Sequence, residues 1–179
     1  KSTVGASRLK SVGKNLFDIA NKNDIDKFTK SFDYWIKPIK LKPNTTYRAN
    51  ALLKGAKVSN AVVSFWSNGN SYTSATTRGD IIGLAGNTFN RSLITDSNPD
   101  WRIALYLPSN IIDAKNKLQE ILDNYNIQLE EGTVATPYEP YKESIANIHL
   151  PEPLLSLPNG TKDEVNLTQG KATIRTGKL

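Results

Sequence analysis

Apolar and polar side chains alternate with a period of two along most of the chain between residues 32 and 129. This alternation is typical of strands that bury one face. It predicts strands over residues 34–41, 46–53, 58–66, 71–76, 88–95, 101–107 and 124–129. Turn-forming residues separate these strands, among them Pro43-Asn44 and the pair Asn68-Gly69, which is a strong hairpin signal. Many short strands with this punctuation predict an all-β protein, a sandwich or a barrel.

Three stretches interrupt the period of two. Residues 20–30 are polar and indicate a loop with one helical turn, and residues 78–86 are glycine-rich and indicate a loop. Residues 109–124 place apolar side chains at near-helical spacing, which leaves a short helix and a long loop both open.

The chain is expected to have three parts. Residues 1–13, rich in Ser, Gly and Lys, predict a linker, and residues 14–142 predict the β-domain. Residues 143–179 predict an extended Pro-rich connector that ends in a possible hairpin over residues 165–179. The β-domain ends in a segment with Pro137 and Pro140, which must be extended because proline restricts both its own φ and the residue before it.

Alternation also assigns a face to each side chain of the strands. The inward set should build the core: Tyr47, Ala49, Ala51, Leu53, Ala61, Val63, Phe65, Trp101, Ile103, Leu105, Leu107, Tyr125, Ile127 and Leu129. The outward set carries aromatic, amide and guanidinium groups: Arg48, Asn50, Ser64, Trp66, Arg102, Tyr106, Asn126 and Gln128. Rings stack on sugar CH faces and the polar groups bind hydroxyls, so this set is a candidate carbohydrate surface. The alternative is an ordinary solvated face, or one covered by a loop or a partner chain.

Composition argues against an enzyme. The chain has no Cys and one His, so thiol chemistry, disulfides, Cys-based zinc sites and His-dependent triads are not expected. Glu130 and Glu131 are adjacent and point to opposite faces, so they cannot form a glycosidase pair with each other. We expect no cofactor. Asp24, Asp26 and Asp33 could supply oxygen ligands for a structural calcium ion, but they lack the EF-hand spacing, which favours an ordinary polar loop.

The distribution of charge and of apolar residues indicates which partners the chain could bind. Residues 1–60 hold 13 Lys and Arg against 4 Asp and Glu, a net charge of +9, whereas the rest of the chain carries −3. A basic half could meet nucleic acid, an anionic polymer or an acidic subunit, or it could be a solvated surface. The lysines are dispersed, so nucleic acid is not expected as a partner. No apolar run reaches 18 residues, so no membrane span is expected. The absence of Met suggests a piece of a longer polypeptide.

Several motifs resemble minor structural tail proteins of phages and prophages of Gram-positive bacteria. They are Asn15-Leu-Phe-Asp18, Leu41-Lys-Pro-Asn-Thr-Thr-Tyr47, the segment from Ile127 to Tyr141, and Leu150-Pro-Glu-Pro-Leu-Leu-Ser-Leu-Pro-Asn-Gly160. The resemblance covers roughly residues 15–179 and is loose over residues 54–124. It implies a carbohydrate-binding-module-like jelly-roll β-sandwich of the galactose-binding type, in a virion tail assembled in the bacterial cytoplasm. It carries over no catalytic residue.

These observations favour a non-enzymatic phage tail or baseplate module that contributes to recognition of host cell-surface glycans. The expected partners are other tail subunits and cell-wall polysaccharide, with a homo-oligomer possible. Two alternatives remain open: a purely structural spacer that binds no sugar, and an accessory binding module of a cell-wall hydrolase.

Overall fold

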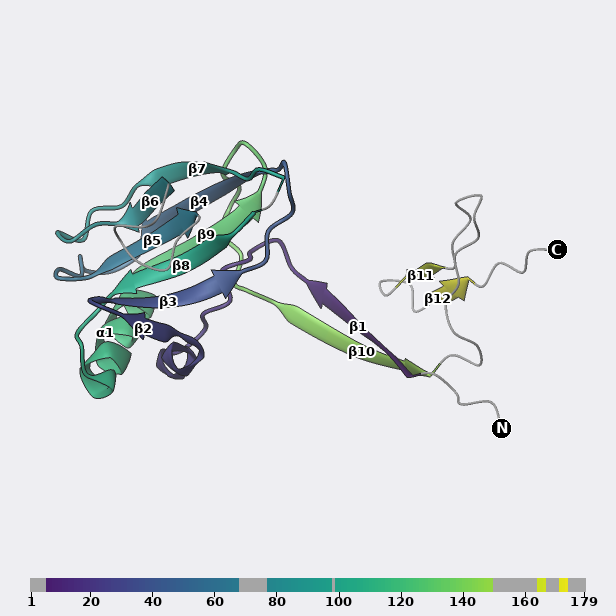
Figure 1. Ribbon diagram of the computed structural model, residues 1–179, viewed down its shortest axis with the longest axis horizontal. Coiled ribbons are helices and arrows are strands. Elements are labelled where there is room, and N and C mark those ends of the chain that lie inside the picture. Colours follow the sequence, from purple (N-terminus) through teal and green to yellow (C-terminus); the bar gives the residue numbers. More distant parts are fainter. Residues whose placement is uncertain (1–5, 68–76, 98, 150–163, 167–170, 174–179) are drawn as a thin grey trace. The chain divides into compact units, whose positions relative to one another are not determined.

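The computed structural model describes residues 6–67, 77–97, 99–149, 164–166 and 171–173. Its contacts divide the chain into two compact units (Figure 1). The larger unit is Gly13–Lys142, and the other combines Lys1–Val12 with Glu143–Leu179.

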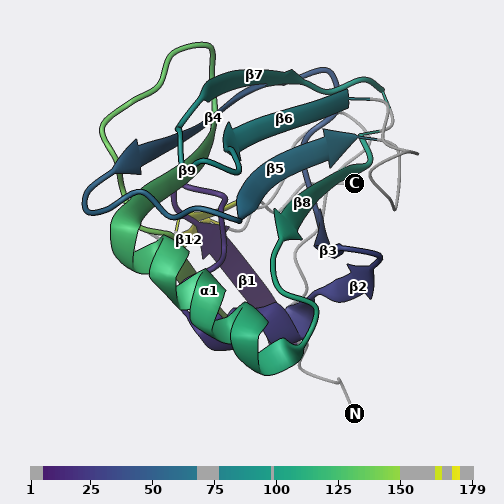
Figure 2. The ribbon, with the colours of Figure 1, turned by 90° about the vertical axis from the view of Figure 1, so that its left-hand side faces the viewer.

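The larger unit contains two antiparallel sheets that pack face to face (Figure 2). The five-stranded sheet has the order β2-β3-β8-β5-β6, and the three-stranded sheet has the order β7-β4-β9. The bounds of the first sheet are β2 (Thr29–Ser31), β3 (Tyr34–Ile39), β8 (Trp101–Tyr106), β5 (Val62–Ser67) and β6 (Thr77–Ile82). Those of the second are β7 (Asn90–Ile94), β4 (Thr46–Leu53) and β9 (Tyr125–Glu131). The described chain is therefore predominantly β, with a sandwich-like arrangement, as the alternation predicted.

The core forms between the two sheets from the inward set that alternation assigned. Phe65 and Ile103 from one sheet and Tyr47 and Leu129 from the other are at most 1 % exposed and belong to one cluster. Leu53 is an exception, because it is 37 % exposed at the last position of β4. The other inward residues are buried, so the period of two identified the core side of each strand correctly.

Two helical elements lie together beside the sheets and close one side of the core (Figure 2). The helix α1 (Ile111–Asn124) begins at Asn110, whose side chain caps the backbone N–H of Asp113, and it buries Leu118 and Ile121 against the sheets. It occupies the stretch for which helix and loop were both open. The 3-10 helix η1 (Lys22–Lys27) supplies the expected turn in the polar segment.

The glycine-rich stretch 78–86 differs from the expected loop, because its first half forms β6. The Leu93 side chain fills the space where a larger residue at position 79 would place its Cβ. A Cβ built on Gly79 would lie 3.2 Å from a side-chain carbon of Leu93, so glycine suits this position of the strand. The expected hairpin at Asn68-Gly69 and the returning strand 71–76 lie outside the described residues.

The described residues of the other unit form two short antiparallel ribbons. Strand β1 (Ala6–Val12), within the segment expected as a linker, pairs with β10 (Glu143–His149), within the expected connector. The second ribbon pairs β11 (Glu164–Asn166) with β12 (Lys171–Thr173), inside the stretch where a terminal hairpin was expected. No sequence signal indicated the partner of β1, because its pairing spans more than a hundred residues.

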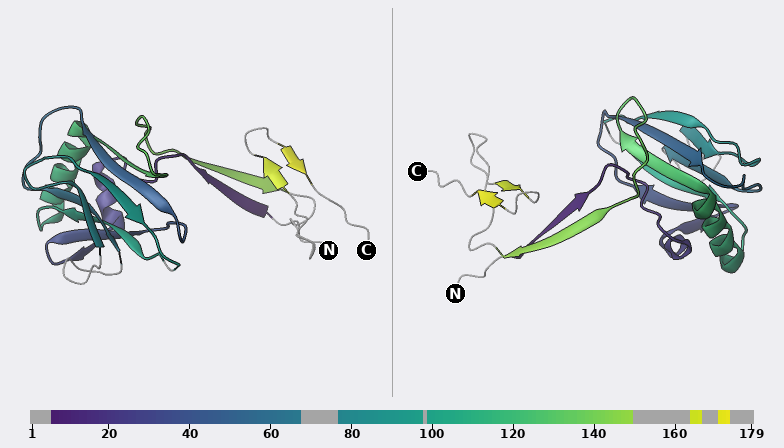
Figure 3. Two further views of the ribbon diagram at one scale, coloured as in Figure 1. Left: turned by 90° about the horizontal axis from the view of Figure 1, so that it is seen from above. Right: turned by 180° about the vertical axis from the view of Figure 1, so that it is seen from behind.

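The chain enters and leaves the larger unit at adjacent residues, since the Gly13 N–H donates to the Lys142 carbonyl at 2.9 Å. After β9 the chain turns at Gly132, whose φ of 139° few other residues tolerate. Residues 133–142 then return along β9, and we call this segment the strap (Figure 3). In the described parts of the chain, no helix is both long enough and apolar enough to cross a membrane.

Candidate functional site

The seven residues proposed to bind carbohydrate lie on two different sheets. Trp66, Arg102 and Tyr106 belong to the five-stranded sheet, where β5 pairs with β8. The remaining four are on the three-stranded sheet: Arg48, Asn50, Asn126 and Gln128. All point away from the common core, so the structure divides the set between two outer faces and does not assemble one surface.

On the five-stranded sheet, the aromatic residues form a packed cluster. Trp66 is fully buried, and its indole N–H donates to the Ser64 hydroxyl at 3.0 Å. The Tyr34 ring lies 4.6 Å from Trp66 and 5.5 Å from Tyr106, measured between centroids. Alternation correctly placed Trp66 opposite the main core, but it could not reveal that the ring is inaccessible there.

Arg102 is also engaged within the protein. Its guanidinium pairs with Asp100 at 2.9 Å, and its side chain is 11 % exposed. It lines a cleft of about 350 Å³ with residues of β2 and β3, namely Thr29, Lys30, Ser31, Ile36 and Pro38. Because its cation is already paired, Arg102 is poorly placed to receive a ligand.

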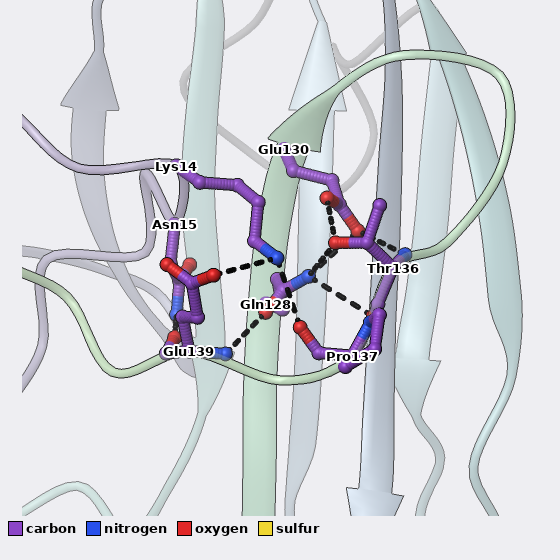
Figure 4. Close-up of polar contacts among 7 residues, drawn as sticks. All are labelled: Lys14, Asn15, Gln128, Glu130, Thr136, Pro137 and Glu139. Carbon is purple, nitrogen blue, oxygen red and sulfur yellow. Dashed lines mark hydrogen bonds and ion pairs between the residues drawn. The ribbon is translucent and has the colours of Figure 1, made fainter.

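The strap is held on the outer face of β9 by buried polar groups (Figure 4). The Glu130 carboxylate accepts hydrogen bonds from the backbone N–H of Thr136 at 2.8 Å and from its hydroxyl at 2.6 Å. The Gln128 amide donates to Glu130 at 2.6 Å and accepts from the Glu139 N–H at 2.9 Å. Both side chains are 1 % exposed, so Gln128 secures the strap and is not presented to solvent.

Hydrogen bonds set the charge state of Glu130. Burial by itself would raise the pKa of this carboxyl, but the hydrogen bonds from Thr136 and Gln128 outweigh burial and hold the pKa below its ordinary value. Glu130 is therefore an ionised, structural carboxylate at neutral pH.

Asn15 joins the beginning of the unit to the strap and to β9 (Figure 4). Its amide N–H groups donate to the carbonyls of Ile127 at 2.9 Å and Glu139 at 3.0 Å, while its oxygen accepts from the Leu129 N–H at 3.1 Å. Lys14 adds a bond to the Pro137 carbonyl at 3.0 Å. Two of the motifs that carry the family resemblance, Asn15-Leu-Phe-Asp18 and the segment ending at Tyr141, thus meet in one structural network.

A cleft of about 310 Å³ lies between the strap and the outer face of the three-stranded sheet. Its lining comes from β4, the start of β7, β9 and the strap: Asn50, Ala51, Leu52, Thr88, Phe89, Asn90, Asn126, Thr136, Pro137 and Tyr138. Two of the seven proposed residues, Asn50 and Asn126, line it. This volume is at the lower end of the range for small-ligand pockets, about 300–1,000 Å³.

The cleft combines free amides with accessible rings. Asn50 and Asn90 are direct cross-strand partners, and Asn126 faces Leu52 one row away. Asn50 Oδ1 is buried and has no hydrogen-bond partner. Phe89 and Tyr138 are each 40 % exposed. Amides that both donate and accept, beside apolar ring faces, are chemically suited to a polyhydroxylated ligand.

Phe89, Asn90 and Tyr138 were missed by sequence reasoning. Asn90 was recoverable, because the strand predicted over residues 88–95 places it on one face at even spacing with other polar residues. Tyr138 was not, because only the fold returns the strap to the sheet.

Two of the three acidic residues considered for calcium have other partners. Asp24 caps η1 by accepting from the N–H groups of Ala20 and Asn21, and it pairs with Lys27 at 2.6 Å. Asp26 pairs with Lys115 at 2.9 Å. In the described residues, no group of three or more His, Cys, Asp or Glu side chains could hold a metal ion.

No protein-family model, curated protein or solved structure matches this chain.

Proposed function

We propose that this chain is a non-enzymatic module of a phage tail or baseplate, and that it binds host cell-surface glycan in the cleft between the strap and the three-stranded sheet. Its fold would be a jelly-roll sandwich of the carbohydrate-binding-module type. The phage assignment rests on the tail-protein motifs, and it would place the chain in the virion beside other tail subunits.

The observation that carries the binding proposal is the grouping of Asn50, Asn90 and Asn126 with the rings of Phe89 and Tyr138 around one cleft. In the described structure, no side-chain hydrogen bond joins these three amides to another residue, and Asn50 Oδ1 is buried without a partner. The site also has a stable wall, since the Thr136–Glu130 contacts fix the strap on one side.

Binding to purified Gram-positive cell walls tests this proposal. The full chain should sediment with the walls, and the double variant Asn50→Ala/Tyr138→Ala should lose most of this binding while it retains the parent's circular dichroism spectrum. Lys30→Ala, in the cleft of the five-stranded sheet, is the matched control and should bind like the parent. Equal binding by the double variant and the parent would rule out this cleft.

The second candidate function is that of a structural spacer, and the exposed ring of Phe32 favours it. Phe32 is 84 % exposed at the tip of the β2–β3 hairpin and has a φ of 51°, which is unusual for a bulky residue. A neighbouring subunit that covers this ring would account for its position. A spacer would leave wall binding absent in the parent chain as well.

A further inference from the structure

The lining of the strap cleft carries no charged side chain, although the chain as a whole has a net charge of +6 and 22 % charged residues. Its polar members are amides, hydroxyls and one phenol. A cleft that receives phosphate or carboxylate groups would need a cation to replace the hydration that the anion loses and to balance its charge.

The charged residues near the cleft lie outside its lining. Arg91 donates to the Asp80 carbonyl at 3.0 Å, and its guanidinium lies over the Phe89 ring, 4.9 Å from the ring centroid. Glu130 is buried under Thr136. Arg48 lies one row from Asn50 on β4 and directly opposite Glu130; its Nε is buried without a hydrogen-bond partner, and the residue does not line the cleft.

The amides are arranged in two adjacent rows of the sheet. Asn50 and Asn90 face each other across β4 and β7, a relationship that brings Cβ atoms to about 4.5–5.5 Å. Each amide offers two donors and one acceptor oxygen, which matches hydroxyls that must donate and accept at once. The unpaired Asn50 Oδ1 adds an acceptor that an anion could not satisfy but a hydroxyl or an acetamido N–H could.

From this lining we infer that the ligand of the cleft is an uncharged saccharide, made of hexose or N-acetylhexosamine units, and that anionic polymers such as polyol phosphates are excluded. This inference rests on the proposed glycan-binding function. The rings of Phe89 and Tyr138 contact the CH faces of the sugar, while Asn50, Asn90 and Asn126 bind its hydroxyl or acetamido groups.

An oligosaccharide array of matched pairs tests the inference with the full chain. Each neutral hexose or N-acetylhexosamine oligomer is paired with the corresponding uronic acid or phosphate ester, and binding is measured at low and high salt. We expect binding to neutral members only, with less than about a twofold change in Kd across the salt series, because uncharged contacts are not screened. Asn50→Ala should weaken this binding about tenfold, in line with one lost hydrogen bond of about 1.4 kcal/mol.

Two results would overturn the inference, and they have different consequences. Binding to the charged members only, falling as salt rises, would overturn it but leave glycan recognition standing. A lack of binding to every array member and to intact cell walls would remove both the inference and the proposed function. Asn90→Lys gives a further check: it should weaken neutral binding, and a gain in affinity for neutral sugars would contradict the assigned contacts.

Discussion

Thr136 donates twice to Glu130, through its backbone N–H at 2.8 Å and its hydroxyl at 2.6 Å. The two residues lie on either side of the turn at Gly132. The two bonds join the strap after the turn to β9 before it, and so close the loop between them. Because Thr136 and Pro137 also line the candidate cleft, this relationship connects the stability of the strap to the shape of the site.

Replacing Thr136 by Val should weaken the strap. Val has nearly the shape of Thr but lacks the hydroxyl that donates to the buried carboxylate, so we expect the free energy of unfolding to fall by about 1–3 kcal/mol. Urea unfolding followed by tryptophan fluorescence measures this loss. Thr133→Val, at an exposed position of the same loop, should leave stability within about 0.5 kcal/mol of the parent. Equal stability of the two variants would mean that the hydroxyl bond to Glu130 contributes little.

Stability should depend on pH through Glu130. Its pKa is lowered in the folded chain, so at acidic pH the unfolded state binds more protons than the folded state, and stability rises with pH in that range. The contribution of Glu130 is fully present above its ordinary pKa of about 4.3 and is lost as pH falls through the lower folded value. Unfolding midpoints of the parent and Glu130→Gln should differ at pH 7 and converge as the pH falls below about 4. A constant difference across this range would contradict the assignment.

Trp66→Ala should act on stability. The side chain is fully buried against Tyr34, Ile36 and Ala104, so its loss leaves a cavity and should cost about 3–5 kcal/mol. Phe32→Ala, which removes an aromatic ring that is 84 % exposed, is the control and should cost less than about 0.5 kcal/mol. Chemical unfolding of the two variants distinguishes them. A Trp66→Ala variant as stable as the parent would show that the outer aromatic cluster is dispensable.

Phe32→Gly should stabilise the β2–β3 hairpin. The Phe32-Asp33 turn needs a positive φ at its first position, where glycine is preferred and a side chain costs about 1–2 kcal/mol. The exposed ring offers no burial in return within this chain, so thermal unfolding should show a higher midpoint. Asp33→Gly, at a position without positive φ, should not raise it. A lower midpoint for Phe32→Gly would indicate that the ring makes stabilising contacts.

The unit Gly13–Lys142 should fold by itself. Both sheets, α1 and the main core cluster lie within it, and its ends already meet through Gly13 and Lys142. The excised unit should therefore give a cooperative unfolding transition with a midpoint close to that of the full chain. Loss of near-ultraviolet circular dichroism on excision would contradict this expectation.

The local pattern of the sequence determined six strands of the larger unit, β3, β4, β5, β7, β8 and β9, and the face that they turn to the core. Val63, Phe65, Ile103 and Leu129 were all identified correctly, because a strand with one buried face must place apolar side chains at every second position. Local pattern was weaker at Gly79, where glycine predicted a loop. The residue lies in β6 instead, because the neighbouring Leu93 side chain occupies the space that a larger side chain would need. It also left residues 109–124 open, since helical spacing over a short stretch occurs in loops as well.

Only the tertiary structure decided which strands share a sheet and therefore which outward residues share a surface. Alternation assigned both Trp66 and Asn50 to the outward side of their strands. However, β5 and β4 belong to different sheets, so the two side chains lie on different outer faces and cannot bind the same ligand. The return of the strap, which brings Tyr138 to Asn126 and buries Glu130, likewise depends on contacts that follow no local period. The sequence by itself determined what each strand buries, because that is a property of neighbouring residues. The fold determined the candidate site, because strand pairing and loop return join residues that are distant along the chain.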